Sequence, residues 1–277
     1  MNNSEATNVT QQSIISDLGV VNPVHVESEI ERRVDFLCNY LMQSRARCLV
    51  LGISGGVDSL LAGRLSQLAV ERARDRGHQA TFYAVRLPYG VQKDEAAAQA
   101  SLKFIRPDKT VTVDIKPATD ALRAAIEAGG AQYRDDAHAD FVTGNTKARQ
   151  RMVAQYALAG AQEGLVIGTD QAAEALMGFF TKFGDGAADL IPLSGLTKRA
   201  VRKLAAALGA PDELVMKVPT ADLETNTPQK PDEEAFGLTY DQIDDFLEGK
   251  SIDSAASEKL IGVYKATAHK RAQPIAP

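Results

Sequence analysis

Short apolar runs alternate with longer amphipathic segments along most of the chain. The run Cys48–Ile53 is continuous, as expected for a parallel strand that is buried on both faces. Runs of the same kind begin at Thr81, Thr110 and Leu165, and a weaker one covers Asp189–Leu193. The pattern therefore predicts five strands with enough chain between them for helical connections.

The segments between these runs carry apolar residues at helical spacing. Ile30, Val34 and Leu37 recur every three or four residues among charged positions, which is typical of an amphipathic helix. Further helices are expected over residues 60–77, 93–104, 118–128, from Asn145 to about 164, and over 172–180, 197–209, 240–249 and 257–271. This alternation predicts an α/β fold: a doubly wound, mostly parallel five-stranded sheet with helices on both faces (Rossmann-like), in a single domain of residues 1–277.

Two segments lack this pattern. Residues 1–25 are polar without strong periodicity, so a mobile or loosely docked lead-in is expected there. The segment Pro219–Gly237 contains three prolines and has no periodic apolar pattern. It is long for a structureless loop in a compact domain, and such loops are usually lids or disordered linkers.

Composition narrows the class of protein only modestly. With 277 residues, 44% of them hydrophobic and 24% charged, the chain resembles an ordinary soluble globular protein. A net charge of −5 argues weakly against a nucleic-acid partner, which usually requires a basic surplus. Cys38 and Cys48 form neither a disulfide framework nor a metal pattern, which favours a reducing cytosol. Without a signal-peptide pattern or a run of roughly 18 apolar residues, a cytoplasmic protein with no membrane partner is expected.

The loop Ser54–Ser59, with the sequence SGGVDS, lies between the first predicted strand and a helix. Its glycines allow positive φ and close approach of the backbone to a ligand. The following helix presents unpaired amides and a partial positive charge, so loop and helix together form an anion cradle. Asp58 would repel a phosphate unless Mg²⁺ lay between them, and Mg²⁺ is commonly held by one or two carboxylates plus phosphate oxygens. The loop therefore predicts a nucleotide phosphate site.

A plain strand-to-helix turn is the alternative interpretation of this loop, with Asp58 and Ser59 as ordinary first-turn residues. The loop is not a Walker A motif, because no lysine follows the second glycine, and it does not match GxGxxG either. The complete strand–loop–helix setting, together with Ser54, favours the phosphate site over the plain turn.

SGGVDS resembles the signature of the N-type ATP pyrophosphatases, which adenylate an oxygen, release pyrophosphate and admit a nitrogen or sulfur nucleophile. Further stretches resemble the bacterial ammonia-dependent NAD synthetases in particular. They run in order from residue 49 to residue 271: LVLGISGGVDS, AVRLPYGVQKDE, GNTKARQRM, VIGTDQAAEALMGFFTKFGDGAADLIPL, TKR, KVPTADLE, PDEEAFGLTYDQIDDFLEG and AHKR. The resemblance implies a homodimeric carbon–nitrogen ligase that converts ATP, deamido-NAD (nicotinic acid adenine dinucleotide) and ammonia into NAD, AMP and pyrophosphate, through an NAD-adenylate. Leu60 departs from the pattern, which often has a small polar residue there.

The resemblance also assigns roles to residues of this chain. The ATP phosphate loop would comprise Gly52, Ile53, Ser54, Gly55, Gly56, Val57, Asp58 and Ser59. Further ATP contacts are expected from Thr169, Lys198 and Thr220, and less directly from Arg86 and Gln92. Deamido-NAD would contact Arg149, Lys182, Asp189, His269 and Lys270, and Mg²⁺ would bind Asp58 and Glu174. Catalytic roles are expected for Asp58, Lys182 and Asp170.

These residue types suit the formation of an acyl-adenylate. When a carboxylate attacks the α-phosphorus, charge builds on the phosphoryl oxygens and on the leaving pyrophosphate, and Mg²⁺ and lysine neutralise it. Ammonia must be neutral to attack the adenylate, so a carboxylate such as Asp170 would orient it or take up its proton. A lid would keep water from the hydrolysable adenylate, and the segment that begins near Thr220 is expected to supply one.

Each assigned residue also has an ordinary structural interpretation. Glu174 could be a first-turn helix acid, and Lys182 and Lys198 could be solvated, as lysines usually are. Arg149 lies in a charged helical stretch, and the basic residues near His269 could simply end a helix. Only the joint fit of these residues to one family pattern favours the functional roles.

Two other functions remain open at the level of sequence. A tRNA-modifying ligase with the same loop would need an RNA-binding domain, a basic surface or a catalytic cysteine pair, and the acidic balance fits this poorly. A nucleotide-binding sensor would bind ATP without needing Glu174 or the substrate-side residues. Nothing in the chain resembles a glutaminase, so free ammonia or a partner is the expected nitrogen source.

Overall fold

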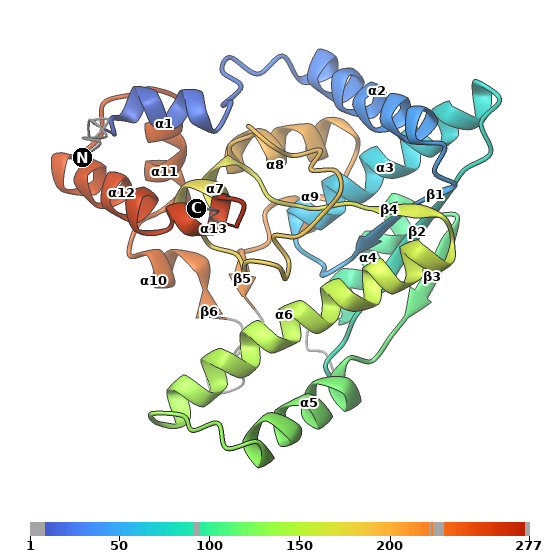
Figure 1. Cartoon of the computed structure of the whole chain (residues 1–277). Helices are drawn as coiled ribbons and strands as arrows, with labels where there is room; N and C mark the ends of the chain where they lie inside the picture. The colour runs from blue at the N-terminus through green and yellow to red at the C-terminus, as the bar shows by residue number, and fades with distance from the viewer. Residues whose placement is uncertain (1–8, 91–94, 222, 224–229, 275–277) are drawn as a thin grey trace, which may run out of the picture.

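A parallel four-stranded sheet forms the centre of the molecule in the computed structural model, which describes residues 9–90, 95–221, 223 and 230–274 (Figure 1). The strand order is β3-β2-β1-β4. Neighbouring strands are parallel, with Cys48 of β1 opposite both Thr81 of β2 and Gly164 of β4. The strands are β1 (Cys48–Gly52), β2 (Thr81–Arg86), β3 (Lys109–Thr112) and β4 (Gly164–Val166).

The predicted fifth strand is reduced to one parallel bridge, between Ile167 and Leu190. The chain turns directly afterwards, where the Ser194 amide donates to the Ile191 carbonyl at 3.2 Å. Pro192 has no amide to donate to a ladder, so the pairing cannot continue. The prediction of a doubly wound α/β fold is confirmed, while the count of five strands is wrong for the described residues.

Helices cover both faces of the sheet, as predicted. The helices α2, α3 and α8 pack on one face, where the largest apolar core lies, and α6 packs on β1 and β4 from the other face. The helices are α1 (Gln11–Asp17), α2 (Val26–Ser44), α3 (Val57–Asp75), α4 (Glu95–Ile105), α5 (Lys116–Ala128), α6 (Asp136–Ala161), α7 (Ala172–Met177), α8 (Lys198–Ala207), α9 (Asp212–Val215), α10 (Asp232–Phe236), α11 (Tyr240–Leu247), α12 (Ser254–Ala266) and α13 (Ala268–Arg271). Within the described ranges, no helix is both long and apolar enough to cross a bilayer.

Helix α6 begins at Asp136 rather than near Asn145. The Asp135 side chain caps it by accepting the His138 amide at 2.7 Å, which satisfies a donor that the helix itself cannot pair. The extra turns continue α6 beyond the sheet, beside α5, at the lower end of the molecule in Figure 1.

The lead-in differs from the expectation over residues 11–17, which form the docked helix α1. Thr10 and Ser13 form a capping box at its start, and the Ile14 side chain is fully buried against α11 and α12. The Gln11 side-chain amide donates to the Phe246 carbonyl at 2.7 Å. A seven-residue helix that buries one side chain is too short to produce a visible apolar period, so the sequence pattern missed it.

Both ends of the segment Pro219–Gly237 have regular structure. A two-residue antiparallel pair, β5 (Thr220–Ala221) with β6 (Lys230–Pro231), closes the base of the segment, and α10 follows directly. Helix α10 buries the side chains of Asp232 and Phe236. Residues 222 and 224–229 lie outside the described residues, so closure of a lid by this segment stays a prediction.

The carboxyl end of β1 is the place where the strand order reverses. The chain passes from β1 to β2 and β3 on one side and returns to β4 on the other side of β1. Neighbouring connections then leave on opposite faces of the sheet, which opens a crevice at this point. The SGGVDS loop follows β1 directly, so the fold places it at this crevice.

Candidate active site

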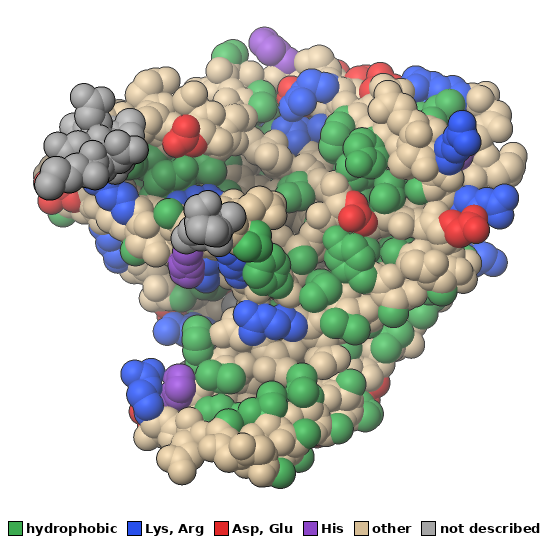
Figure 2. Space-filling model, viewed as in Figure 1, with side chains coloured by type: hydrophobic (Ala, Val, Ile, Leu, Met, Phe, Trp, Pro, Cys, Tyr) green, Lys and Arg blue, Asp and Glu red, His purple; other side chains and the backbone are tan. Residues whose placement is uncertain are grey.

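A cavity of about 490 Å³ lies at the carboxyl ends of β1 and β4. The surface is hollowed between the body of the molecule and the projecting end of α6, with basic side chains near the rim (Figure 2). Among the residues predicted from sequence, the lining contains Gly52, Ile53, Ser54, Gly56, Val57, Asp58, Ser59, Thr169, Glu174, Lys198, Thr220 and Lys270. The structure therefore brings the expected phosphate loop, both expected Mg²⁺ ligands and part of the substrate side to one cavity.

The loop after β1 is held by its own hydroxyl groups. The hydroxyl oxygens of Ser54 and Ser59 lie 3.1 Å apart, and Ser59 donates to the Gly56 carbonyl at 3.0 Å. Gly55 has φ +90°, and a Cβ there would lie 3.0 Å from the Ala98 amide nitrogen of α4, so glycine is required on both counts. Gly56 caps α3 without a side-chain bond to its first-turn amides, which leaves these amides to a ligand.

Lys198 is the cation that faces the loop from the first turn of α8. Its side chain is 2% exposed, and its Nζ lies 2.5 Å from Asp58 Oδ2. The Tyr240 ring lies below the ammonium, with the centroid 5.0 Å from Nζ. Burial disfavours the charged ammonium, but the carboxylates of Asp58 and Glu174 outweigh it and raise the pKa of Lys198. Lys198 is therefore positively charged at neutral pH.

Carboxyl groups crowd this end of the cavity. Burial, followed by the charge of Asp58, raises the pKa of Glu174 well above its usual value, although Lys198 opposes this. Burial and then the charges of Asp185 and Asp58 raise the pKa of Asp170 to about 7. The pKa of Asp232 is raised by burial, against a hydrogen bond from Tyr240. Asp58, Glu174 and Asp232 all act on the single Lys198 charge, and a bound cation would favour the ionised form of these carboxyl groups.

The donor set suits Mg²⁺. Asp58 Oδ1 is buried and has no hydrogen-bond partner among the described residues, while Glu174 lines the same cavity. Over the described part of the chain, no three carboxylate, histidine or cysteine side chains converge to hold a metal by themselves. Two carboxylates with a ligand's oxygens and water are the environment in which Mg²⁺ is usually bound.

Four of the five residues expected to contact deamido-NAD lie together near the C-terminal helix α13. The Arg149 guanidinium donates to the Lys182 carbonyl at 3.2 Å, and Lys182 Nζ donates to the His269 carbonyl at 2.5 Å. Lys270 Nζ donates to the carbonyls of Gly178 and Phe180, at 2.8 and 2.9 Å, and lines the cavity. Of this basic cluster, Lys270 lines the cavity, where the charge of Asp185 acts on it.

Other predicted residues lie outside the described lining of the cavity, and their roles stay predictions. Asp189 accepts the Val166 amide at 2.7 Å, at the end of β4. Arg86 is 2% exposed and pairs with Glu95 at 2.9 Å, so its guanidinium joins the end of β2 to the start of α4. Gln92 lies outside the described residues. Asp170 is close enough for its charge to be coupled to Asp185 and Asp58, although it is outside the described lining.

Several residues of the site were missed by reasoning from sequence. Gln155 of α6 accepts the Gly52 amide at 2.7 Å, and Lys217 donates to the Gly55 carbonyl at 3.3 Å. Asp185 and Asp232 also line the cavity. Asp185 lies between two glycines, a pattern typical of a turn, and this pattern could have identified it as a candidate site residue. The others carry no local signal, because each meets the loop only through long-range packing.

Comparison with known proteins shows which family this chain belongs to. A family model described as NAD synthase matches residues 29–274 of the chain. The chain belongs to the NAD synthase family. An NH₃-dependent NAD⁺ synthetase of Streptomyces coelicolor is 62% identical over 267 residues, which cover 96% of this chain and 97% of that protein. One from Burkholderia pseudomallei is 60% identical over 264 residues, covering 95% and 93% of the two chains.

Solved structures of NAD synthase relatives superpose on the whole molecule. The crystal structure of NAD⁺ synthetase from Burkholderia pseudomallei has a TM-score of 0.83 and 57% identity, covering 95% of this chain and 96% of that one. The NMN synthetase from Francisella tularensis has a TM-score of 0.79 and 32% identity, covering 92% and 99%. The predicted membership of the NAD synthetase family and the predicted fold are therefore confirmed.

Proposed function

We infer that this member of the NAD synthase family amidates deamido-NAD with ammonia, consuming ATP and releasing AMP and pyrophosphate. The observation that carries the inference is the pair of Asp58 and Lys198 at the mouth of an uncapped glycine-rich loop, in a cavity that Glu174 shares. A loop with free amides binds phosphate, and the paired charges meet the pyrophosphate that leaves. The names of the relatives support deamido-NAD as the carboxylate substrate.

The SGGVDS loop and α8 contact different parts of ATP in this proposal. The first-turn amides of α3 bind phosphate oxygens, with Ser54 and Ser59 hydroxyl groups beside them. Lys198 places an ammonium where charge grows on the leaving pyrophosphate. Mg²⁺, held by Asp58 and Glu174, would neutralise phosphate oxygens and orient the reacting groups. Thr169 and Thr220, which line the same cavity, complete the proposed ATP contacts.

Deamido-NAD occupies the part of the cavity beside Lys270 in this proposal. Lys270 reaches the cavity directly, and Arg149, Lys182 and His269 support it through the contacts with α13. A dinucleotide carries two phosphates, so basic groups there offset its charge and hold its carboxylate near the ATP α-phosphorus. Asp189 would contact the substrate from the end of β4.

The reaction itself is the first test. Purified protein receives ATP, Mg²⁺ and deamido-NAD with either ammonium or glutamine, and NAD is measured in a coupled assay. NAD formed with ammonium supports the proposal. Nicotinic acid mononucleotide replaces deamido-NAD in a parallel reaction, because a relative with 32% identity is an NMN synthetase. Preference for the mononucleotide, a requirement for RNA, or ATP binding without pyrophosphate release would each contradict the proposal.

Ammonia is proposed to meet the adenylate beside Asp170, which acts as the proton acceptor. Burial and then the charges of Asp185 and Asp58 raise the pKa of Asp170 to about 7, so the carboxylate is protonated, and useless as a base, at lower pH. The rate at constant free ammonia should therefore fall as the pH drops through about 7, and Asp170→Asn should lose the rate by roughly 10²-fold together with this dependence. Normal ammonia-saturated turnover in Asp170→Asn would exclude this role. Asp185→Asn should move the dependence to lower pH without removing it, because the charge of Asp185 is one of the causes that raise the pKa of Asp170.

A homodimer through α5 and α6 is proposed from exposed apolar side chains on these two packed helices. Leu122 and Ile126 of α5 are 41% and 42% exposed, and Val153 of α6 is 51% exposed. Apolar side chains gathered on neighbouring helices mark contact surfaces. We expect the double variant Leu122→Glu with Ile126→Glu to sediment as a monomer, while Tyr40→Glu, altered at a side chain 44% exposed on α2, stays dimeric. The reverse result would move the interface to α2.

A further inference from the structure

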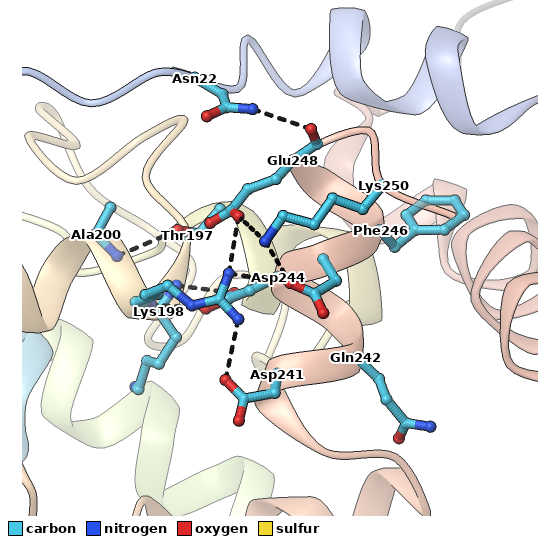
Figure 3. A network of polar contacts seen from close by, with 12 residues as sticks. Asn22, Thr197, Lys198, Ala200, Asp241, Gln242, Asp244, Phe246, Glu248 and Lys250 are labelled. Atoms are coloured by element: carbon cyan, nitrogen blue, oxygen red, sulfur yellow. Dashed lines mark hydrogen bonds and ion pairs between the residues drawn. The ribbon is translucent and has the colours of Figure 1, made fainter. Parts of the chain in front are cut away.

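The first three amides of α8 are all occupied by side chains of the protein. The Lys198 and Arg199 amides donate to the two carboxylate oxygens of Asp244, at 3.0 and 2.7 Å, and the Ala200 amide donates to the Thr197 hydroxyl at 3.1 Å (Figure 3). These are donors that a helix cannot pair by itself. Unlike the start of α3, the start of α8 offers no amide to a phosphate, so α8 acts on the cavity through the Lys198 side chain.

Helix α11 contacts Lys198 twice. Asp244, which is 1% exposed, holds the Lys198 main chain, and the Tyr240 ring lies 5.0 Å below its ammonium. Tyr240 and Asp244 are four residues apart and therefore lie on the same face of α11. One face of α11 therefore positions both the backbone of Lys198 and its ammonium group.

Arg199 reinforces the same contact from the edge. Its guanidinium reaches three carboxylates of α11: Asp241 at 3.0 Å, Asp245 at 3.1 Å and Glu248 at 2.8 Å. Figure 3 labels Asp241 and Glu248 on α11, on either side of Asp244 along the helix. Each exposed ion pair contributes little to the stability of the fold. Together with the buried Asp244, these pairs hold α8 and α11 in one register.

We propose that Asp244 is a positioning residue for the ATP reaction, because its carboxylate holds the first turn of α8 so that Lys198 reaches Asp58 and the leaving pyrophosphate. A lysine side chain has many rotamers, and its ammonium is placed accurately only when its backbone and surroundings are held. Asp244 itself does not touch substrate in this proposal; it acts through Lys198. The inference rests on the proposed role of Lys198 at the ATP phosphates.

A double-mutant cycle tests the inference. Asp244→Asn keeps the shape of the side chain but removes its charge and turns one acceptor into a donor. It should lower kcat by about 10- to 100-fold and raise the KM for ATP, because a small misplacement of a catalytic group has effects of this size. The KM for deamido-NAD should stay within about twofold, because none of its proposed contacts is made by α8. In the Lys198→Met background, Asp244→Asn should cause little further loss.

Two further variants separate positioning from folding. Asp253→Ala removes the side chain that caps α12 by accepting the Ala256 amide at 3.1 Å, and it should leave the kinetics for ATP unchanged. Arg199→Met weakens the same α8–α11 contact at the surface, so it serves as the test if Asp244→Asn does not fold, with a smaller loss in the same direction.

Three results would overturn the proposal, and they are distinguishable. Native kinetics in a folded Asp244→Asn enzyme would show that the cap is only structural. An equal loss from Asp244→Asn with and without Lys198 would show that Asp244 acts on something else. Native turnover of ATP in Lys198→Met alone would remove the proposed role of Lys198, and the inference with it.

Discussion

Asp58→Ala is expected to abolish NAD formation, with a loss of roughly 10³-fold or more in kcat. Asp58 combines three features in one side chain: it pairs with Lys198 at 2.5 Å, its second oxygen is buried without a partner among the described residues, and it is a proposed Mg²⁺ ligand. Removing it leaves Mg²⁺ with Glu174 and frees Lys198 to adopt another position. The coupled NAD assay, run over a range of Mg²⁺ concentrations, measures both consequences.

The control for Asp58→Ala lies on the same helix. Asp75 is the last residue of α3 and is exposed, so Asp75→Ala removes the same charge from the other end of the helix and should leave the rate unchanged. Asp58→Asn keeps the volume of the side chain and tests the charge separately. A rate within a few-fold of the native enzyme in Asp58→Asn, at the same Mg²⁺ concentration, would remove Asp58 from the metal site.

Lys198→Met should lower kcat by about 10²- to 10³-fold and also destabilise the folded protein by about 3 kcal/mol at neutral pH. The rate falls because a buried positive charge is lost where pyrophosphate charge develops. The stability falls because Asp58, Glu174 and Asp232 lose the cation that opposes the rise in the pKa of Glu174 and of Asp232. Methionine fills a similar volume, so packing changes little.

The loss of stability in Lys198→Met should depend on pH in a defined direction. Without the lysine, the folded protein holds these carboxyl groups in the protonated form up to higher pH than the usual 4.5 for Glu174 and 3.8 for Asp232. The folded state then binds more protons than the unfolded chain, so the variant loses stability as the pH rises from about 4 towards neutrality and regains it on acidification. Urea unfolding at about pH 5 and about pH 8 measures this.

Lys203→Met, at an exposed position of α8, is the matched control, with native activity and no extra dependence of stability on pH. A penalty for Lys198→Met that is the same at both pH values would mean that charge repulsion does not cause it. Native activity in Lys198→Met would contradict the proposed contact between Lys198 and pyrophosphate.

The local pattern of the sequence determined the strand–loop–helix unit that contains the proposed phosphate loop. An apolar run, two glycines and an amphipathic helix are neighbours in the chain, so their geometry follows from backbone conformation and helix amides alone. The same holds for α8 and α11, because the spacing of their apolar residues is enough to predict both helices. The short helix α1 was missed, and the strand predicted over Asp189–Leu193 is a single bridge at Leu190, because these features depend on one buried side chain and one proline rather than on a period.

Only the tertiary structure decided which side chains meet at the loop. Lys198 reaches Asp58 across 140 positions of the chain, and Gln155 reaches Gly52 across 103. Periodicity tells which face of a helix is buried, but the partner on that face depends on how helices pack, and many packings bury the same residues. For the same reason Arg86 pairs with Glu95, and Asp244 holds the first turn of α8, with no local signal for either contact.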